Sequence, residues 1–425
     1  MRMSSLLIRD VVLRGQRTNI FCENGRITAI DTAEHPTDQV LDGQGMLAHP
    51  PLINSHTHAS MTLFRGNGDD LPLMEWLTTR VWPYEQEITR DEVYWGARLA
   101  ILEMIRAGTV FFNDMYWDFH AVADAVEETG VRAQIAAVLI SPEGNGDLSK
   151  QIAKNEQLYE EAKRYSDRVR YAVAPHAIYT VSEEALRWSA EFSREKDIVL
   201  HTHLSETEHE VKECFEQHGC SPVEYLGRLG MLSDRLVAAH TVQLSERDIE
   251  LLGEHKVVCA HNPVSNMKLA VNGVYPYRKL QASGAITAIA TDGAGSNNNL
   301  DMFEEMKIAA LLQKLTDNDT TSLPARAVLD MAVKNPAKVF GLDEEPLQVG
   351  GLADLILIDI RLPEMNPMHN VASHLVYAAN GNAVDSVVCD GKVLMEHRTI
   401  EGQEEVIAKA GEAARMMFAR VDGKR

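Results

Sequence analysis

Eight short apolar segments, rich in β-branched residues, recur between about residues 50 and 340 of this chain. The intervening stretches are long enough for helices, and residues 91–108 have apolar side chains at helical spacing and end at Gly108. Strands that alternate with helices predict a parallel α/β architecture, and eight of them favour a closed (β/α)8 TIM-type barrel over an open sheet. The predicted strands span residues 50–58, 108–115, 131–140, 169–177, 197–205, 235–242, 255–263 and 284–294.

Both ends of the chain have a different residue pattern, in which short apolar runs are separated by turn residues. The turn at residues 23–26, Glu-Asn-Gly-Arg, predicts a β-hairpin. Segments 350–360 and 385–400 resemble the N-terminal runs. We therefore expect residues 1–48 and 345–425 to form one small composite β-sandwich domain with a C-terminal helix, and residues 49–344 to form the barrel inserted between its halves.

The charge balance limits the kinds of partner. The formal net charge of −21 disfavours nucleic acid and anionic membrane surfaces, because both are bound through Lys and Arg. Five cysteines without CxxC spacing indicate a reducing cytoplasm. Arg9 and Asp10 interrupt the apolar N-terminus, and no stretch approaches the roughly 18 apolar residues of a membrane span. A small-molecule substrate fits best, and a homo-oligomer is compatible with the sequence.

Nearly every predicted strand ends in a residue that can bind a metal or move a proton. In a (β/α)8 barrel these carboxyl ends converge on one catalytic face. The second strand ends in Asn113 and Asp114, and the third has no comparable residue. The remaining strands end in His56 and His58, His176, His201 and His203, His240, His261, and Asp292. A single strand-end histidine such as His261 is as consistent with an ordinary core residue, but that explanation is weak for six strand ends together.

Two positions suggest a metal site. His56 and His58 lie two residues apart on one strand, so both imidazoles point to the same side. Asp292 lies between a predicted strand and a Gly/Asn/Ser turn. A carboxylate buried there without a partner is costly, so a cation is its reasonable companion. A helix N-cap is the alternative interpretation of Asp292, and capping by Ser296 or Asn297 is compatible with either.

The fifth strand contributes a possible acid–base pair. Glu206 follows His203 by three residues, which places its carboxylate on the loop just beyond the strand end. If His203 binds a metal, Glu206 is close enough to exchange protons with a molecule held against that metal. Spacing alone leaves His201 open as the ligand instead of His203.

Several motifs together resemble a known family. Residues 51–66 (PLINSHTHASMTLFRG) and 71–77 (LPLMEWL) are followed by HTHLSET, AAHTV, AHNPVSNMKL and TDGAGSNNNLDMFEEMK. They look like the amidohydrolase superfamily, and most closely its 5-methylthioadenosine/S-adenosylhomocysteine deaminases, over roughly residues 1–400. The resemblance is less specific for substrate, since related guanine, cytosine and triazine hydrolases share much of it.

The resemblance implies a mononuclear metal site that activates water as hydroxide, with zinc the usual occupant and Fe²⁺ or Mn²⁺ left open. Other branches of the superfamily hold two metals bridged by a carboxylated lysine after the fourth strand. Here that strand ends in AVAPHAIY, without lysine, which favours one ion per chain. The residues that match the family's ligands are His56, His58, His203 and Asp292.

The same resemblance assigns the other roles. Glu206 matches a proton-shuttling glutamate, His240 orients the attacking hydroxide, and Asp292 accepts its proton. Glu85 matches the residue that holds the ribose hydroxyls, and His176 matches another substrate contact. An aromatic wall and a further substrate contact are expected from Trp76 and Ser296, although an interior tryptophan is the alternative interpretation of Trp76.

One departure bears on the substrate. Members that accept homocysteine compounds resemble one another in carrying arginines after the third strand, whereas the segment after residue 140 has none. We expect hydrolytic removal of the exocyclic amine, as ammonia, from methylthioadenosine, adenosine or 5′-deoxyadenosine, with S-adenosylhomocysteine disfavoured unless Lys150 or Lys154 reaches its carboxylate. The alternatives are an amidohydrolase that deaminates or dechlorinates a guanine, pterin or triazine ring, and a metal-free binding protein on the same barrel.

Overall fold

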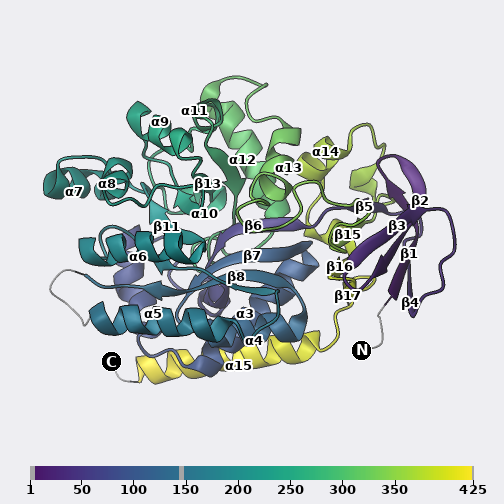
Figure 1. Cartoon of the computed structure of the whole chain (residues 1–425), viewed down its shortest axis with the longest axis horizontal. Coiled ribbons are helices and arrows are strands. Elements are labelled where there is room, and N and C mark those ends of the chain that lie inside the picture. The colour runs from purple at the N-terminus through teal and green to yellow at the C-terminus, as the bar shows by residue number, and fades with distance from the viewer. Residues whose placement is uncertain (1–4, 143–147, 424–425) are drawn as a thin grey trace.

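The computed structural model describes residues 5–142 and 148–423. Figure 1 shows a barrel of strands surrounded by helices, with a smaller sheet at one side. The fourth predicted strand is divided into β9 and β10 around Ala172 and Val173, and the others form one strand each. The barrel strands are β6 (Leu52–Thr57), β7 (Thr109–Tyr116), β8 (Arg132–Leu139), β9 (Val169–Tyr171), β10 (Ala174–Pro175), β11 (Leu200–Leu204), β12 (Leu236–His240), β13 (Val258–His261) and β14 (Ile286–Ile289).

All pairings between these strands are parallel. A bridge between Val173 and Leu200 joins β6–β10 to β11–β14. At the other seam, the Asp292 amide donates to the His56 carbonyl over 3.1 Å, next to β14 and within β6. The parallel sheet is therefore closed, and the predicted (β/α)8 barrel is confirmed.

The helices begin where short polar side chains cap them. Thr89, Ser182, Thr207, Ser221 and Ser245 each accept a hydrogen bond from the third residue of the helix that follows. The helices around the barrel are α3 (Arg90–Arg106), α4 (Phe119–Thr129), α5 (Leu148–Ala162), α6 (Glu183–Lys196), α7 (Glu208–His218), α8 (Pro222–Arg228), α9 (Glu246–Glu254), α10 (Pro263–Lys268), α11 (Tyr277–Ser283), α12 (Met302–Asp317) and α13 (Ala325–Val333).

Short helical segments follow β6 and cover the carboxyl ends of the strands. They are η1 (Ala59–Phe64), α1 (Leu73–Trp76), η2 (Leu77–Val81) and α2 (Trp82–Glu85). Further turns of helix precede the last strands: η3 (Pro363–Met365), α14 (Val371–Ser373), η4 (His374–Ala378) and η5 (Gly381–Ala383). The segment from α1 to α2 supplies part of the wall of the cavity described below.

Strands from both termini form one eight-stranded sheet, in the order β17-β16-β15-β5-β1-β2-β3 with β4 beside β1. It has a small core of its own, separate from that of the barrel, which includes Leu6, Ile8 and Leu355. The expected hairpin joins β2 to β3, with Asn24 and Gly25 at positive φ. The strands are β1 (Ser5–Leu13), β2 (Gln16–Glu23), β3 (Arg26–Asp31), β4 (Gln39–Asp42), β5 (Leu47–His49), β15 (Leu355–Ile358), β16 (Val384–Cys389) and β17 (Lys392–Met395).

The C-terminal helix α15 (Gln403–Asp422) lies on the barrel rather than on this sheet. Figure 1 shows it in yellow along α3, and Phe418 packs against the rings of Phe64 and Tyr84. We expected this helix within the terminal domain. The buried residues of α15, which include Val406, Ala410 and Met417, form an apolar face, and the helix packs on the barrel helix α3.

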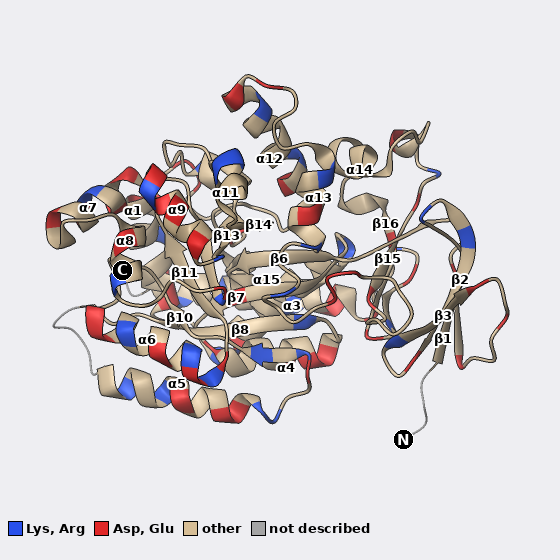
Figure 2. Cartoon of the chain, turned by 45° about the horizontal axis from the view of Figure 1, so that its top comes forward, with Lys and Arg blue, Asp and Glu red and all other residues tan. Residues whose placement is uncertain are grey.

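Charged side chains lie mainly on the outer helices. Figure 2 shows both acidic and basic residues along α5 and α6, which is typical of solvated helix faces. Among the helices of the described residues, none combines the length and the apolar character needed to cross a membrane.

Candidate active site

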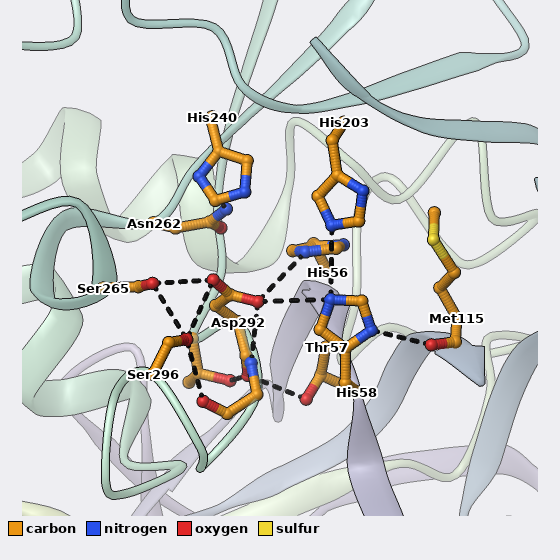
Figure 3. A network of polar contacts seen from close by, with 12 residues as sticks. His56, Thr57, His58, Met115, His203, His240, Asn262, Ser265, Asp292 and Ser296 are labelled. Carbon is orange, nitrogen blue, oxygen red and sulfur yellow. Dashed lines mark hydrogen bonds and ion pairs between the residues drawn. The ribbon is translucent and has the colours of Figure 1, made fainter. Parts of the chain in front are cut away.

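Four side chains from three parts of the barrel converge at the carboxyl ends of the strands (Figure 3). His56 lies in β6 and His58 directly after it, His203 lies in β11, and Asp292 follows β14. The Nε2 atoms of His58 and His203 are 3.2 Å apart. Asp292 Oδ1 lies 3.3 Å from His56 Nε2 and 3.4 Å from His58 Nε2. The ligand atoms of His56, His58 and His203 lie within 4.8 Å of one another, and so do those of His56, His240 and Asp292.

The hydrogen bonds of these rings fit a bound cation. His58 Nδ1 donates to the Met115 carbonyl over 2.7 Å, and His203 Nδ1 donates to the His176 carbonyl over 2.8 Å. An imidazole that donates through Nδ1 has its lone pair on Nε2 in the neutral tautomer, and in that tautomer two lone pairs face each other at 3.2 Å. Two acceptors cannot bond to each other, whereas a cation between them satisfies both. The buried His56 Nε2 also lacks a hydrogen-bond partner among the described residues.

The structure separates His203 from His201. His201 Nε2 makes a 2.8 Å hydrogen bond with Nδ1 of His56, on the side of that ring away from Asp292. It therefore orients His56 in the way that outer partners orient metal-binding imidazoles. His203, rather than His201, has a free nitrogen directed at the group.

Burial favours the neutral form of two of these imidazoles, those of His56 and His203. It lowers the pKa of His56 to about 4, and it lowers that of His203 well below its usual value, with neighbouring histidines adding to the effect. For Asp292 burial acts in the opposite direction, but the neighbouring His56, His240 and His58 outweigh it and hold the pKa well below its usual range. Neutral imidazoles beside an ionised carboxylate are the protonation states that divalent metals require.

Asp292 is held from behind by two hydroxyls. Ser265 Oγ donates to Asp292 Oδ2 over 2.7 Å, and Ser296 Oγ donates to the same atom over 3.1 Å. Oδ1 therefore remains directed at the histidines (Figure 3). Asp292 has a φ of 62°, an unfavourable backbone conformation for a non-glycine residue that surrounding contacts must maintain.

Glu206 and His240 form a second pair beside this group. His240 also has a positive φ of 74°, and its Nδ1 donates to Asn266 Oδ1 over 2.8 Å and lies 3.8 Å from Glu206 Oε1. Burial opposes the charged form of His240, but Glu206 and Asp292 outweigh it and raise its pKa. Burial raises the pKa of Glu206 as well, against the attraction of His240. A carboxyl group with a raised pKa is suited to proton transfer near neutral pH.

A cavity opens beside these groups and is lined by both apolar and polar side chains. Burial raises the pKa of Glu85 at the end of α2, while Tyr116, His58 and Trp117 favour its carboxylate. His176 has a pKa lowered to about 3 by burial and nearby histidines, so it faces the cavity as a neutral ring. The predicted residues that line the cavity are His58, Trp76, Glu85, His176, His203, Glu206, His240, Asp292 and Ser296.

Other strand-end residues have structural contacts. His261 stacks on Tyr275 with ring centres 4.4 Å apart, as expected for a core histidine. Asn113 donates to the Ser55 carbonyl over 3.0 Å, and Asp114 accepts from the Ala59 amide over 2.7 Å, so both hold the β6 segment. His56 is completely buried and is not among the residues that line the cavity.

Sequence reasoning missed four residues of this region: Ser265, Asn266, Tyr116 and Trp117. Ser265 and Asn266 follow the seventh strand within AHNPVSNMKL, so their position after a strand end was a usable signal. Tyr116 is the last residue of β7, two residues beyond Asp114, so its place at the strand end was a usable signal as well.

A closed barrel with a His/Asp group at its carboxyl-terminal face is the architecture of a metal-dependent type of barrel enzyme. The model of the Amidohydrolase family matches residues 47–394. The chain therefore belongs to the amidohydrolase family, and it is a hydrolytic enzyme that acts on C–N bonds.

Individual relatives agree with this assignment. The chain is 49% identical over 382 residues to a 5′-deoxyadenosine deaminase of Methanoregula boonei, covering 90% of this chain and 86% of the relative. It is 43% identical to 5-methylthioadenosine/S-adenosylhomocysteine deaminase 1 of Archaeoglobus fulgidus, over 94% of this chain and 95% of that one. The crystal structure of an adenosine deaminase from Xanthomonas campestris with bound zinc superposes with a TM-score of 0.91 at 33% identity, over 99% of each chain.

Proposed function

We propose that this enzyme is a hydrolytic deaminase of adenine nucleosides, and that it uses one zinc ion held by His56, His58, His203 and Asp292. The 3.2 Å approach of His58 Nε2 and His203 Nε2 is the observation that carries the metal assignment, because a cation between the two nitrogens would satisfy both. Three imidazole nitrogens and one carboxylate oxygen are a usual donor set for zinc. The bound zinc in the similar Xanthomonas enzyme supports this choice of metal.

When bound, the ion would supply Lewis-acid chemistry, because it lowers the pKa of water in its coordination sphere towards 7. Asp292 then accepts a proton from the water that attacks the purine carbon bearing the amine. Glu206 delivers a proton to the adjacent ring nitrogen, so that the ring does not become an anion as the new C–O bond forms. His240 donates to the developing oxygen charge. The C–N bond then breaks as the amine takes the proton held by Asp292 and leaves as ammonia, while the new hydroxyl returns its proton to Glu206 and becomes the carbonyl.

Glu85 is the residue that we expect to select a nucleoside over a free base. Glu85 lines the same cavity as the His/Asp group, with Tyr116 and Trp117 beside its carboxylate. A carboxylate can accept hydrogen bonds from both ribose hydroxyls, each worth roughly 1.5–3 kcal/mol. A site built on such bonds rejects analogues that lack the hydroxyls, because the buried carboxylate is then left unpaired.

The rest of the wall favours a small or apolar 5′ substituent. Val138, Ile140, Leu73, Leu77 and Leu269 line the cavity, and the described lining residues include no Lys or Arg. Bringing an amino-acid carboxylate against such a wall without a counter-ion is unfavourable. We infer that methylthioadenosine, adenosine and 5′-deoxyadenosine are better substrates than S-adenosylhomocysteine, and that Trp76, His176 and Ser296 contact the bound nucleoside.

Ammonia release from these four nucleosides and from free adenine tests the proposal. We expect the three compounds without an amino-acid group to have the highest kcat/KM, and adenine to react hardly at all. Glu85→Gln should remove most of the preference for nucleosides over adenine, whereas Glu75→Gln, an exposed change on the same covering segment, should leave it unaltered. If S-adenosylhomocysteine is the best substrate, the interpretation of the 5′ wall is wrong.

A further inference from the structure

Glu305 is a completely buried acidic residue outside the cavity, on α12. No Lys, Arg or His of the described residues forms an ion pair with it. Its two oxygens instead accept hydrogen bonds from two different loops. Oε2 accepts from the Val264 amide over 3.2 Å, and Oε1 accepts from Nδ2 of Asn297. Burial without a counter-ion raises the pKa of Glu305 well above its usual value, although the hydrogen bonds from Asn297 and Val264 favour the ionised form.

The first loop, after β13, carries the partners of two proposed catalytic groups. Val264 lies in the first turn of α10, directly before Ser265 and Asn266. Ser265 Oγ donates to Asp292 Oδ2 over 2.7 Å, and Asn266 Oδ1 accepts from His240 Nδ1 over 2.8 Å. Whatever holds the Val264 amide therefore sets the position of both partners.

The second loop, after β14, carries Asp292 itself. Asn297 Nδ2 donates to the Thr291 carbonyl over 2.6 Å as well as to Glu305. Thr291 directly precedes Asp292, whose φ of 62° has to be maintained by such contacts. One carboxylate thus ties together the backbone that presents Asp292 and the backbone that presents the partners of Asp292 and His240.

We propose that Glu305 is a positioning residue, which holds the loops after β13 and β14 at the spacing that aligns Asp292 and His240 for the reaction. The inference rests on the proposed function, because it assigns a role in the same site. The position of Glu305 also requires two hydrogen-bond acceptors, and a side-chain amide provides only one. Both oxygens face N–H donors, so a glutamine at this position would turn its own N–H₂ group towards one of them.

Glu305→Gln tests this, with Glu304→Gln as the matched control. Glu304 is the preceding residue of the same helix, it is exposed, and it contacts Asn299 rather than either loop anchor. For Glu305→Gln we expect kcat per bound zinc to fall by about 10- to 100-fold, the scale expected for misplaced catalytic groups. KM should change by less than about threefold, because Glu85 and the apolar wall are untouched. The control should match the wild-type enzyme.

The rate of zinc release to a chelator gives a readout that does not depend on turnover. It should rise in Glu305→Gln and stay unchanged in the control, because Asp292 is then less firmly held. If the wild-type enzyme releases no ammonia, the proposed function is wrong. The rate of zinc release would then be the only test of the role of Glu305, and an unchanged rate in Glu305→Gln would overturn that role. In an active enzyme, kcat per zinc within about twofold of wild type would overturn the proposal, even if the thermal midpoint fell.

A second variant covers the case in which Glu305→Gln does not fold. Asn297→Ala removes one of the two donors and leaves the carboxylate and the Val264 contact in place. It should lower kcat per zinc in the same direction by a smaller factor. Normal kcat per zinc in this variant would also overturn the proposal.

Discussion

At the scale of single residues, Glu206 occupies a position suited to proton transfer but not to metal binding. Its backbone amide and that of Ser205 each donate to Glu210 over 2.8 Å, so the loop that carries it is held from one side. Its carboxylate lies beside His240 and outside the His/Asp group that could hold an ion. Removing its acid–base capacity should therefore leave the metal in place.

Glu206→Gln should lower kcat by about 10²–10⁴-fold, the usual contribution of a general acid–base group. Zinc content, measured by elemental analysis of the same sample, should equal that of wild type. Glu208→Gln, two residues along and exposed, serves as the control and should keep full activity. Normal turnover in the Glu206 variant would assign the proton shuttle to another group.

At the scale of elements, helix α15 is attached to the barrel through a buried acidic residue of α3. Glu92 is only 4% exposed and receives two hydrogen bonds from Arg420, at 2.8 and 2.7 Å. The same carboxylate forms the capping box of α3 with Thr89. Burial raises the pKa of Glu92, but Arg420 and Thr89 outweigh it and the net pKa lies below the ordinary value of 4.5.

Glu92→Gln should destabilise the protein at neutral pH, by about 1–3 kcal/mol for a lost charge-assisted hydrogen bond. Because the folded-state pKa is lowered, the stabilisation is complete above the unfolded value and is lost as the pH falls through the folded value. The difference in thermal midpoint between wild type and variant should thus be largest near pH 7 and shrink below about pH 4. Glu412→Gln, which loses only an exposed pair with Lys409, should show little difference at either pH.

At the scale of the whole molecule, the proposed metal site bridges the seam at which the first and last barrel strands meet. His56 belongs to the first barrel strand and Asp292 follows the last, so an ion bound by both would also stabilise the closure between β14 and β6. A ligand that binds only the folded state stabilises it by about 4 kcal/mol when present at 1,000 times its dissociation constant.

Elemental analysis should find about one divalent ion per chain, because the two possible donor groups among the described residues share His56 and the fourth strand ends without lysine. Chelation should abolish turnover and lower the thermal midpoint, and added zinc should restore both. Two tightly held ions per chain, or full activity after complete removal of metal, would contradict this.

The sequence by itself determined the barrel and the approximate place of its chemistry. Alternating strand and helix patterns are local, and a closed barrel brings every strand end to one face, so His56, His58, His203, Glu206, His240 and Asp292 could be singled out without coordinates. The hairpin at Asn24 and Gly25 was equally local, because only the turn residues decide it. The roles of the site residues stay predictions until the variants above are measured.

Only the tertiary structure decided which atoms meet. Spacing could not separate His203 from His201, because the distinction lies in which ring nitrogen faces His58 and which faces His56. The placement of α15 on α3, and the link from Glu305 to the loops around Asp292, join segments that are far apart in the chain. Such contacts depend on closure of the barrel and on side-chain packing, and a periodic pattern records only which face of an element is apolar, not which distant element will cover it.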